Sequence, residues 1–432
     1  MDAVLILTLI LGLFGLLLVL GIPIFAALGV PSILGIYLVG GTSALNVVPS
    51  VLHRGIASYS LICIPLFILM GETLARTSIG ARLYTLFHTW LSRVRCSLAI
   101  ASVGASAIFG AMSGVSVAGA ATIGRVAIPE MLKRRYDPGL AGGSVAAAGS
   151  LALLIPPSVG FVLYGEIASQ SIGKLFSAAI VPGLLLSVLM MLYLYGLSRI
   201  RPSMAPDEAQ KVSWRERWQA LRDVWAAIVL IVAVLGTIYL GIATPTEASG
   251  LGAAGALLVA LGYRELDRAK LREIVRSTIV TSSMILLIVA AALLFGHVLM
   301  RLQAPQMLIA WVAALAQPDW VILLLILVFL LIVGMFLDIV SIILITTPIV
   351  LPVITSLGLD PIWFGVVMII MCEMAVITPP IGLNLYVIKG VAPEISLRDI
   401  TMGALPFVLV EALAVLILVL FPQLVLWLPS HM

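Results

Sequence analysis

Hydroxyl, carboxylate and exposed backbone oxygens recur at four places in an otherwise apolar sequence. Two are double-proline breaks, LIPPSVG at 154–160 and ITPPIGL at 377–383, and two are polar interruptions, MSGVS at 112–116 and FLDIVS at 336–341. A proline inside a helix removes a backbone hydrogen bond and clashes with the preceding turn, so adjacent prolines leave carbonyl groups unpaired. Hard cations such as sodium prefer oxygen ligands of these kinds. The four places therefore predict a cation site.

The chain that carries these breaks is predicted to be an integral membrane protein. It has 432 residues, of which 62% are hydrophobic and 10% charged, whereas soluble domains carry about 25% charged residues. Its apolar runs are continuous, which is typical of membrane helices and not of β-barrel strands. The three cysteines lie in apolar runs, so we expect them to pack rather than to form disulfides. The first apolar run has no basic segment before it and is interpreted as a retained span.

The elements that must position the oxygens are helical spans and two helical hairpins. The apolar spans cover about 3–21, 23–41, 56–75, 139–171, 175–198, 223–241, 245–263, 277–300, 361–391 and 400–428. Two interrupted stretches, about 97–132 and 307–355, are predicted to be re-entrant hairpins that enter and leave on one side of the membrane. The double prolines make 139–171 and 361–391 discontinuous helices. Unwound backbone at membrane depth is tolerated only where it is buried or lines a cavity.

The basic residues sort the loops by side of the membrane. They flank the first hairpin and fill 199–222 and 264–276, whereas none lies between Arg301 and Lys389. By the positive-inside rule, the first hairpin opens to the cytoplasm, the second opens to the outside, and both termini face outward. The segment 199–222 is predicted to be a cytoplasmic amphipathic connector whose tryptophans and arginines contact anionic lipid.

The two halves of the chain share a pattern at one offset. Six positions recur 223 residues later, namely Pro129, Asp137, Pro138, Gly142, Pro156 and Pro157, matched by Pro352, Asp360, Pro361, Gly365, Pro379 and Pro380. Five spans and one hairpin per half give an odd number of crossings, so the second half is inverted. This predicts a first repeat at 1–198, the connector at 199–222 and a second repeat at 223–432. Inverted repeats with matched broken helices are typical of secondary transporters, with the site near the midplane.

These motifs together resemble the large membrane subunit of tripartite ATP-independent periplasmic (TRAP) transporters, the DctM-like permeases. The resemblance covers the whole chain and is most specific at SGVSVAGAATIG (113–124), GSLALLIPPS (149–158), GIATPTEASGLGA (241–253) and VITPPIGLNLYVIKG (376–390). It implies an elevator-type importer of an organic acid anion in the bacterial inner membrane, with sodium as the coupling ion and no other cofactor. It also implies a small four-helix membrane subunit (DctQ-like) and a periplasmic substrate-binding protein (DctP-like) as partners.

The resemblance implies two sodium sites at the hairpin tips and helix breaks. The first comprises Ser113, Gly114, Ser116, Ser150, Pro156 and Ser158, and the second comprises Asp338, Thr378, Pro379 and Gly382. Val115 stands where the family more often has a hydroxyl. Asn384, which the resemblance also assigns to the second site, and Arg125 are the residues expected to contact substrate.

Each of these assignments has a structural alternative. Asp338 could instead cap a helix, Ser113 and Ser116 could allow close helix packing, and Arg125 could snorkel to the cytoplasmic face. Glu166 and Glu373 are either coupling acids or partners of nearby hydroxyls.

The TPTEA string is interpreted as a helix cap, and other function classes fit the sequence poorly. Thr244 would be the N-cap, with Pro245 in the first turn and Glu247 at the third position. The chain has no HExxH motif for a metalloprotease and no Walker A motif for ATP hydrolysis. An aspartyl protease needs two buried aspartates, and only Asp338 qualifies. One serious alternative remains open: a stand-alone sodium–carboxylate symporter of related architecture without a binding protein. A channel fits poorly, because pore-lining rings do not require two matched broken helices.

Overall fold

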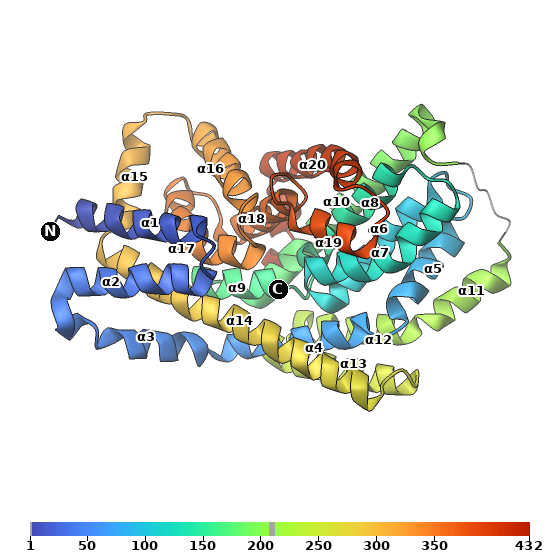
Figure 1. Ribbon diagram of the computed structural model, residues 1–432, viewed down its shortest axis with the longest axis horizontal. Helices are drawn as coiled ribbons and strands as arrows, with labels where there is room; N and C mark the ends of the chain where they lie inside the picture. Colours follow the sequence, from blue (N-terminus) through green and yellow to red (C-terminus); the bar gives the residue numbers. More distant parts are fainter. Residues whose placement is uncertain (1, 207–211) are drawn as a thin grey trace.

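The computed structural model describes residues 2–206 and 212–432, and these form α-helices and short 3-10 turns without a β-strand (Figure 1). Among these residues, five helices are long and apolar enough to cross a membrane, or up to eight spans if each of three bent helix pairs counts as one. The prediction of an all-α membrane fold is confirmed. The predicted connector 199–222 includes residues 207–211, which lie outside the described part of the chain.

The first half of the chain ends in a hairpin, a broken helix and a long helix. Its helices are α1 (Ala3–Val19), α2 (Ile24–Ala44), α3 (Val47–Ile56), α4 (Cys63–Ala75), α5 (Ile79–Leu91), α6 (Ser97–Ser113), α7 (Ser116–Lys133), α8 (Pro138–Leu154), α9 (Val159–Ala168) and α10 (Ile172–Ile200).

The second half repeats that order after a different beginning. Its helices are α11 (Trp214–Asp223), α12 (Trp225–Tyr239), α13 (Pro245–Gly262), α14 (Arg268–Arg301), α15 (Ala304–Ala314), α16 (Asp319–Gly334), α17 (Ile339–Ser356), α18 (Pro361–Val376), α19 (Leu383–Val391), α20 (Leu397–Leu420) and α21 (Gln423–Leu426). The series α6–α7, α8–α9, α10 thus has a counterpart in α16–α17, α18–α19, α20.

The two hairpins form where glycine and polar residues interrupt apolar helices. In the first, α6 ends at Gly114, whose φ of 62° is one that residues with a side chain rarely adopt. The second hairpin is α16 and α17, so it occupies 319–356 rather than the whole predicted 307–355. The short helix α15 precedes it as a separate element: α15 ends at Ala314, Ala316 has a left-handed φ of 48°, and Pro318 is the N-cap of α16.

The two broken helices begin with the same cap in both halves. The Asp137 side chain accepts a hydrogen bond from Leu140 N at 3.0 Å at the start of α8. The Asp360 side chain accepts one from Ile362 N at 2.7 Å at the start of α18. A proline at the first helical position follows each aspartate. The positions matched at the 223-residue offset therefore perform the same structural task.

Helix α8 lies at the centre of the hairpins and broken helices. All of its residues from Gly139 to Leu154 are buried, and it packs against α6, α7 and α20. Gly139 and Gly143 bring α8 so close to α20 that a Cβ on Gly403 would overlap the Gly139 backbone. Such close backbone approach is typical of membrane helix interfaces built from small residues.

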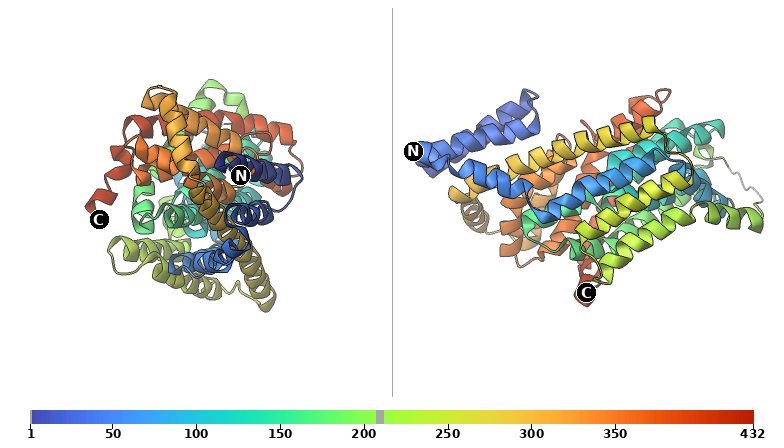
Figure 2. Two further views of the ribbon diagram at one scale, coloured as in Figure 1. Left: turned by 90° about the vertical axis from the view of Figure 1, so that its left-hand side faces the viewer. Right: turned by 90° about the horizontal axis from the view of Figure 1, so that it is seen from below.

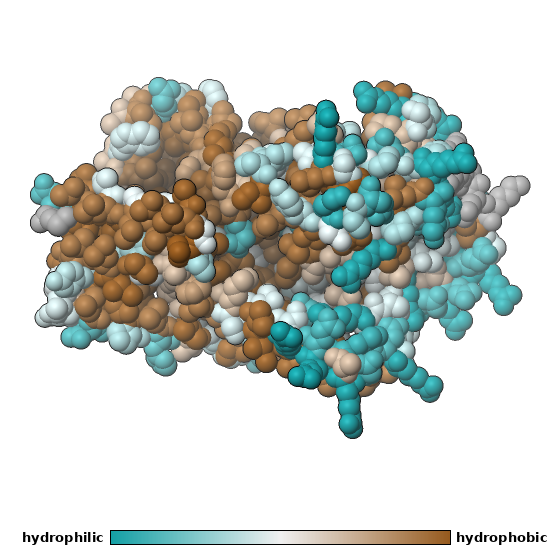
Figure 3. Space-filling model, in the orientation of Figure 1, coloured by the Kyte–Doolittle hydropathy of each residue, from teal (hydrophilic) through white to brown (hydrophobic). Residues whose placement is uncertain are grey.

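The remaining long helices form a second layer beside this group. Helices α14, α4, α13 and α12 lie side by side, and α1 and α2 extend from one end (Figure 2). Helix α14 is longer than the predicted span 277–300 because its charged start, from Arg268, continues the same helix. The surface is apolar around α1, α2, α15 and α16 and hydrophilic at the opposite end, around α5 and α11 (Figure 3).

Two smaller predictions are confirmed by the local geometry. Thr244 Oγ1 accepts a hydrogen bond from Glu247 N at 3.3 Å, and Thr244 N donates to Glu247 Oε2 at 2.8 Å. This is the predicted capping box, with Pro245 in the first turn of α13. The three cysteines, Cys63, Cys96 and Cys372, are free and buried.

Candidate functional site

The tip of the first hairpin lies against the first helix break. Val159 N, at the start of α9, donates a hydrogen bond to Gly114 O at 3.3 Å. A Cβ on Gly114 would lie 2.7 Å from Pro157 O, so glycine is required for this approach as well as for its positive φ. The hairpin tip and the helix break, which lie about 40 residues apart in the sequence, are therefore in contact. This contact brings together four buried residues: Ser113, Ser116, Pro156 and Ser158.

A hydrogen-bond relay joins this tip to the second half of the chain. Asn384 Nδ2 donates to Ser116 Oγ at 2.9 Å, and Ser116 Oγ donates to Glu373 Oε2 at 2.9 Å. Asn384 Nδ2 also donates to Ala146 O at 3.3 Å. All three side chains are buried. Because a hydroxyl has a single hydrogen, Ser116 gives it to Glu373 and keeps only a lone pair for any further ligand.

A second buried carboxylate, Glu411 of α20, lies behind the first break. Its Oε1 is 2.8 Å from Ser150 Oγ, which also hydrogen bonds to Ala147 O at 2.6 Å. Neither Glu411 nor Glu373 forms an ion pair with any described residue. The sequence interpretation missed Glu411, although an acid inside an apolar span is costly and usually functional, and this signal could have identified it.

Several buried oxygens at the site have no hydrogen-bond partner among the described residues. They are Ser113 Oγ, Ser158 Oγ, Glu373 Oε1, Asn384 Oδ1 and Glu411 Oε2. Buried polar atoms are normally satisfied, since leaving one unpaired costs about 1–3 kcal/mol. The first predicted site therefore holds hydroxyl oxygens that are free to bind a cation, and these donors fit the chemistry of sodium.

The second predicted site is built around the start of α17 and the second break. Asp338 is the N-cap of α17: its side chain accepts hydrogen bonds from Ser341 N, at 3.3 Å, and from the Ser341 hydroxyl. Thr378 Oγ1 donates to Met374 O at 2.6 Å, and Gly382, with a φ of 59°, precedes α19. The capping alternative for Asp338 is thus observed, whereas an ion-binding role for these residues stays a prediction.

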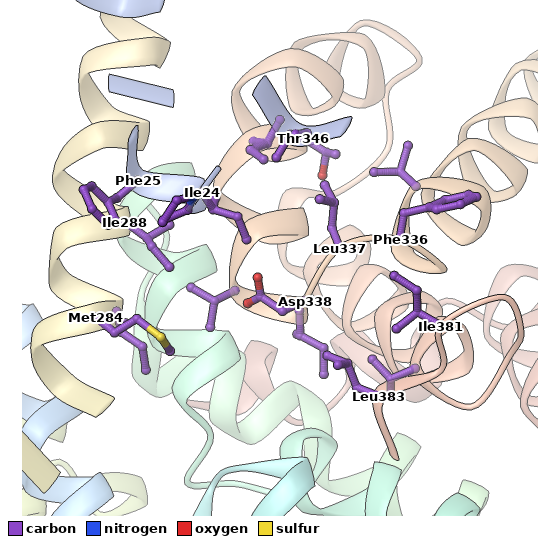
Figure 4. Close-up of a pocket in the computed structure, with 18 of the residues that line it drawn as sticks. Ile24, Phe25, Met284, Ile288, Phe336, Leu337, Asp338, Thr346, Ile381 and Leu383 are labelled. Atoms are coloured by element: carbon purple, nitrogen blue, oxygen red, sulfur yellow. The ribbon is translucent and has the colours of Figure 1, made fainter. Parts of the chain in front are cut away.

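Both sites border one cavity of about 1410 Å³ (Figure 4). The first residues of the four half-helices line it: Ser116 of α7, Val159 of α9, Ile339 of α17 and Leu383 of α19. Asp338 is part of the wall, and most of the remaining wall is made of apolar side chains of α1, α2, α14, α16 and α17, with the hydroxyls of Thr281 and Thr346 among them. Among the described lining residues, Asp338 is the only charged one. Helix N-termini carry partial positive charge. The N-terminus of α17 is capped by the Asp338 carboxylate, whereas those of α7, α9 and α19 have no acidic cap and favour an anion in the cavity.

Two residues considered at the sequence level lie away from the cavity wall. Arg125 is exposed on α7, nine residues beyond Ser116, and does not line the cavity. Its predicted contact with substrate stays a prediction. Glu166 of α9 is half-buried and also does not line the cavity, whereas Glu373 meets the nearby hydroxyl of Ser116.

Comparisons with known proteins agree over nearly the whole chain. The family described as "Tripartite ATP-independent periplasmic transporter, DctM component" matches residues 11–424. The C4-dicarboxylate TRAP transporter large permease protein DctM of Pseudomonas aeruginosa is 36% identical over 373 residues, which cover 86% of each chain. The isethionate TRAP transporter permease protein DctMQ of Oleidesulfovibrio alaskensis is 34% identical over 414 residues, and the match spans 95% of this chain and 64% of that one.

A solved structure shows the same fold at low sequence identity. The YdaH transporter of Alcanivorax borkumensis superposes with a TM-score of 0.63 at 17% identity, and the match covers 90% of each chain.

Proposed function

The chain belongs to the DctM family of tripartite ATP-independent periplasmic transporters, as their large permease component, and we propose that it imports an organic acid anion together with sodium ions. The observation that carries this proposal is that the first residues of four half-helices line one cavity, to which the two predicted oxygen-rich sites contribute Ser116 and Asp338. The N-termini favour an anion, and the unpaired oxygens favour a hard cation.

The residues of the cavity wall determine which groups compensate the negative charge of the substrate. No lysine, arginine or histidine is among the described lining residues, so the cavity wall offers a bound anion no basic side chain. The helix N-termini and the sodium ions then supply the positive charge, so substrate and sodium stabilise each other's binding. The two relatives described above are named for C4-dicarboxylate and isethionate, which are both organic anions. We assign an organic acid of this general class as the substrate.

The proposed partners are a small four-helix membrane subunit and a periplasmic substrate-binding protein, with the complex in the bacterial inner membrane. The DctMQ relative is longer than this chain, and the match spans 64% of it. In the proposed cycle, the hairpins and broken helices around α8 move as one body against α4, α13 and α14. Gly71 of α4 fits such an interface, because a Cβ there would lie 2.8 Å from Ser113 O at the hairpin tip.

The test is uptake of a candidate organic acid by liposomes that contain this chain, its small subunit and the binding protein. We expect uptake with an inward sodium gradient and none when potassium replaces sodium. Equal uptake with both cations would contradict sodium coupling. Uptake that proceeds equally well without the binding protein would instead favour the stand-alone symporter.

A further inference from the structure

Helix α11 is a short surface helix at the hydrophilic end of the molecule (Figures 1 and 3). It begins with a capping box in which Glu216 N donates to Ser213 Oγ at 3.3 Å and Ser213 N donates to Glu216 Oε2 at 2.8 Å. It ends at Asp223, and the chain bends by 51° into α12. The helix is therefore fixed at both ends and lies at an angle to the apolar helix that follows it.

One face of α11 turns toward α5 and carries the acidic residues. Ala220 is buried, and Glu216, Gln219 and Asp223 line a small hollow with His88 and other residues of α5. Trp90 Nε1 of α5 donates a hydrogen bond to Arg217 O at 3.3 Å. These contacts fix the rotation of α11 about its own axis.

The opposite face presents tryptophan and arginine outward. Trp214 is 66% exposed and Trp218 is 57% exposed, and Trp225, at the start of α12, is 60% exposed. Arg215 and Arg222 are also exposed, and neither forms an ion pair with a described residue.

Three other arginines, Arg76, Arg82 and Arg217, are engaged within the protein. Arg76 pairs with Glu72 and Glu273, and Arg82 pairs with Glu265. Arg217 lies over the Trp214 ring at 5.1 Å from its centroid. Arg215 and Arg222 have no such partner among the described residues, and they lie on the same short helix as the exposed rings of Trp214 and Trp218.

We propose that this outer face of α11 binds the phosphate headgroups of anionic phospholipids in the cytoplasmic leaflet. The arginines meet the phosphates, and the tryptophan rings lie at headgroup level, where amphipathic rings are favoured. The acidic residues Glu216 and Asp223 are exposed, but they lie on the side of α11 that borders α5, so the side with arginine and tryptophan is the one that meets the anionic surface. Charge complementarity therefore selects lipid as the occupant of this face. Because α11 packs on α5, and α5 leads into the first hairpin, the bound lipid steadies the end of the molecule from which that hairpin starts.

The test measures lipid binding by the purified full chain in a neutral detergent. Phosphatidylglycerol or phosphatidylcholine is titrated, and bound lipid is counted by native mass spectrometry. We expect the wild-type chain to prefer phosphatidylglycerol. The double variant Arg215→Gln/Arg222→Gln should lose about fivefold in affinity for each charge removed, since a basic residue near an anionic surface contributes about 1 kcal/mol. Added salt should reduce the wild-type preference.

Two control variants separate lipid recognition from charge and folding. Arg54→Gln/Lys174→Gln removes two exposed charges from α3 and α10, outside the proposed lipid site, and it should bind phosphatidylglycerol as the wild type does. Arg215→Lys/Arg222→Lys keeps the charge and should retain most of the binding. The thermal midpoint of each variant in lipid-free detergent checks that the fold is intact.

Two results would overturn the proposal. One is an unchanged preference for phosphatidylglycerol in the double glutamine variant. The other is no preference in the wild-type chain, combined with protection of Trp214 and Trp218 from chemical modification only when the small subunit is bound. That second outcome would identify the face as a protein interface. Neither measurement involves substrate or sodium, so failure here is separate from failure of the proposed transport function.

Discussion

Ser116 connects Asn384 with Glu373, and the sequence could assign a role to each of these three residues only separately. From the sequence it is a predicted ion ligand, Asn384 a substrate contact and Glu373 either a coupling acid or a hydroxyl partner. The structure shows one relay, in which Asn384 donates to Ser116 and Ser116 donates to Glu373. Because these partners come from both halves of the chain, a local motif could not reveal them. The unpaired Asn384 Oδ1 and Glu373 Oε1 remain available to a ligand.

Asp338 combines a structural task with a proposed chemical one, and two substitutions separate them. Asn can cap a helix as Asp does, but it lacks the negative charge. Asp338→Asn should therefore keep the thermal midpoint while sodium-driven uptake falls about 10- to 100-fold, as expected for loss of a charged ligand. Asp338→Ala should lose uptake and should also lower the thermal midpoint, because the cap is lost.

Uptake assays and thermal unfolding of the same preparations measure the two effects. Full uptake by Asp338→Asn would leave capping as the only role of this side chain.

Glu373 is predicted to hold the hairpin tip in position through its hydrogen bond. Glu373→Gln keeps an acceptor for the Ser116 hydroxyl, so we expect its thermal midpoint and its uptake to stay near wild-type values. Glu373→Ala removes the acceptor and leaves Ser116 without it in a buried place, which costs about 1–3 kcal/mol. The alanine variant should unfold at a lower temperature and transport more slowly. If the glutamine variant is as inactive as the alanine variant, the carboxylate itself is required, and positioning is not its role.

At the scale of elements, the contact between α8 and α20 depends on glycine. A Cβ on Gly403 would overlap the Gly139 backbone, and a Cβ on Gly143 would overlap Gly403. Gly403→Ala must therefore push the helices apart, and overpacking of this kind destabilises by about 1–3 kcal/mol. Gly196→Ala, in α10, is the matched control because nothing lies within 4 Å of its added Cβ. The thermal midpoint of unfolding should fall for Gly403→Ala only. An equal fall for Gly196→Ala would show that the close contact between α8 and α20 does not determine the stability.

The sequence predicts the broken elements better than the amphipathic ones. Hairpins and breaks are marked by glycine and proline, whose backbone effects are local and can be read directly. Helix α5 has no such marker: its buried side, with Ile79, Leu83 and Tyr84, alternates with polar residues, so no apolar span was predicted there. Its buried side packs against α6, which follows it in the chain, and against α11, which is distant in sequence. The pattern of α5 alone does not indicate these partners.

The contacts of the site could not be predicted for the same reason. Residue types at the tips and breaks indicate oxygen ligands, and the structure does bring the first tip and first break together. Some of these oxygens form hydrogen bonds within the protein and others have no partner. The difference depends on residues far away in the sequence, such as Glu411, which lies 261 residues from its partner Ser150. Periodicity contains no information on such pairs. The ion ligands themselves therefore stay predictions.

At the scale of the whole molecule, the repeated order of elements fits two halves of related structure. Matched aspartates cap the broken helices, and a long helix follows each pair. The distribution of basic residues predicts that these halves have opposite orientations in the membrane, with both termini outside. The helix order alone does not distinguish inverted from parallel repeats, so orientation needs a direct measurement.

Lys174 and Arg398 provide a matched pair for that measurement. Each is exposed near the start of a corresponding helix, α10 or α20, and they are 224 residues apart. If the repeats are inverted, Lys174→Cys should react with a membrane-impermeant maleimide applied to intact cells, whereas Arg398→Cys should react only after permeabilisation. The native cysteines are buried and should stay unlabelled in the folded protein, so the unsubstituted chain is the control. Labelling of both variants from the same side would mean that the halves are parallel, and the predicted positions of the hairpins and of both termini would then be wrong.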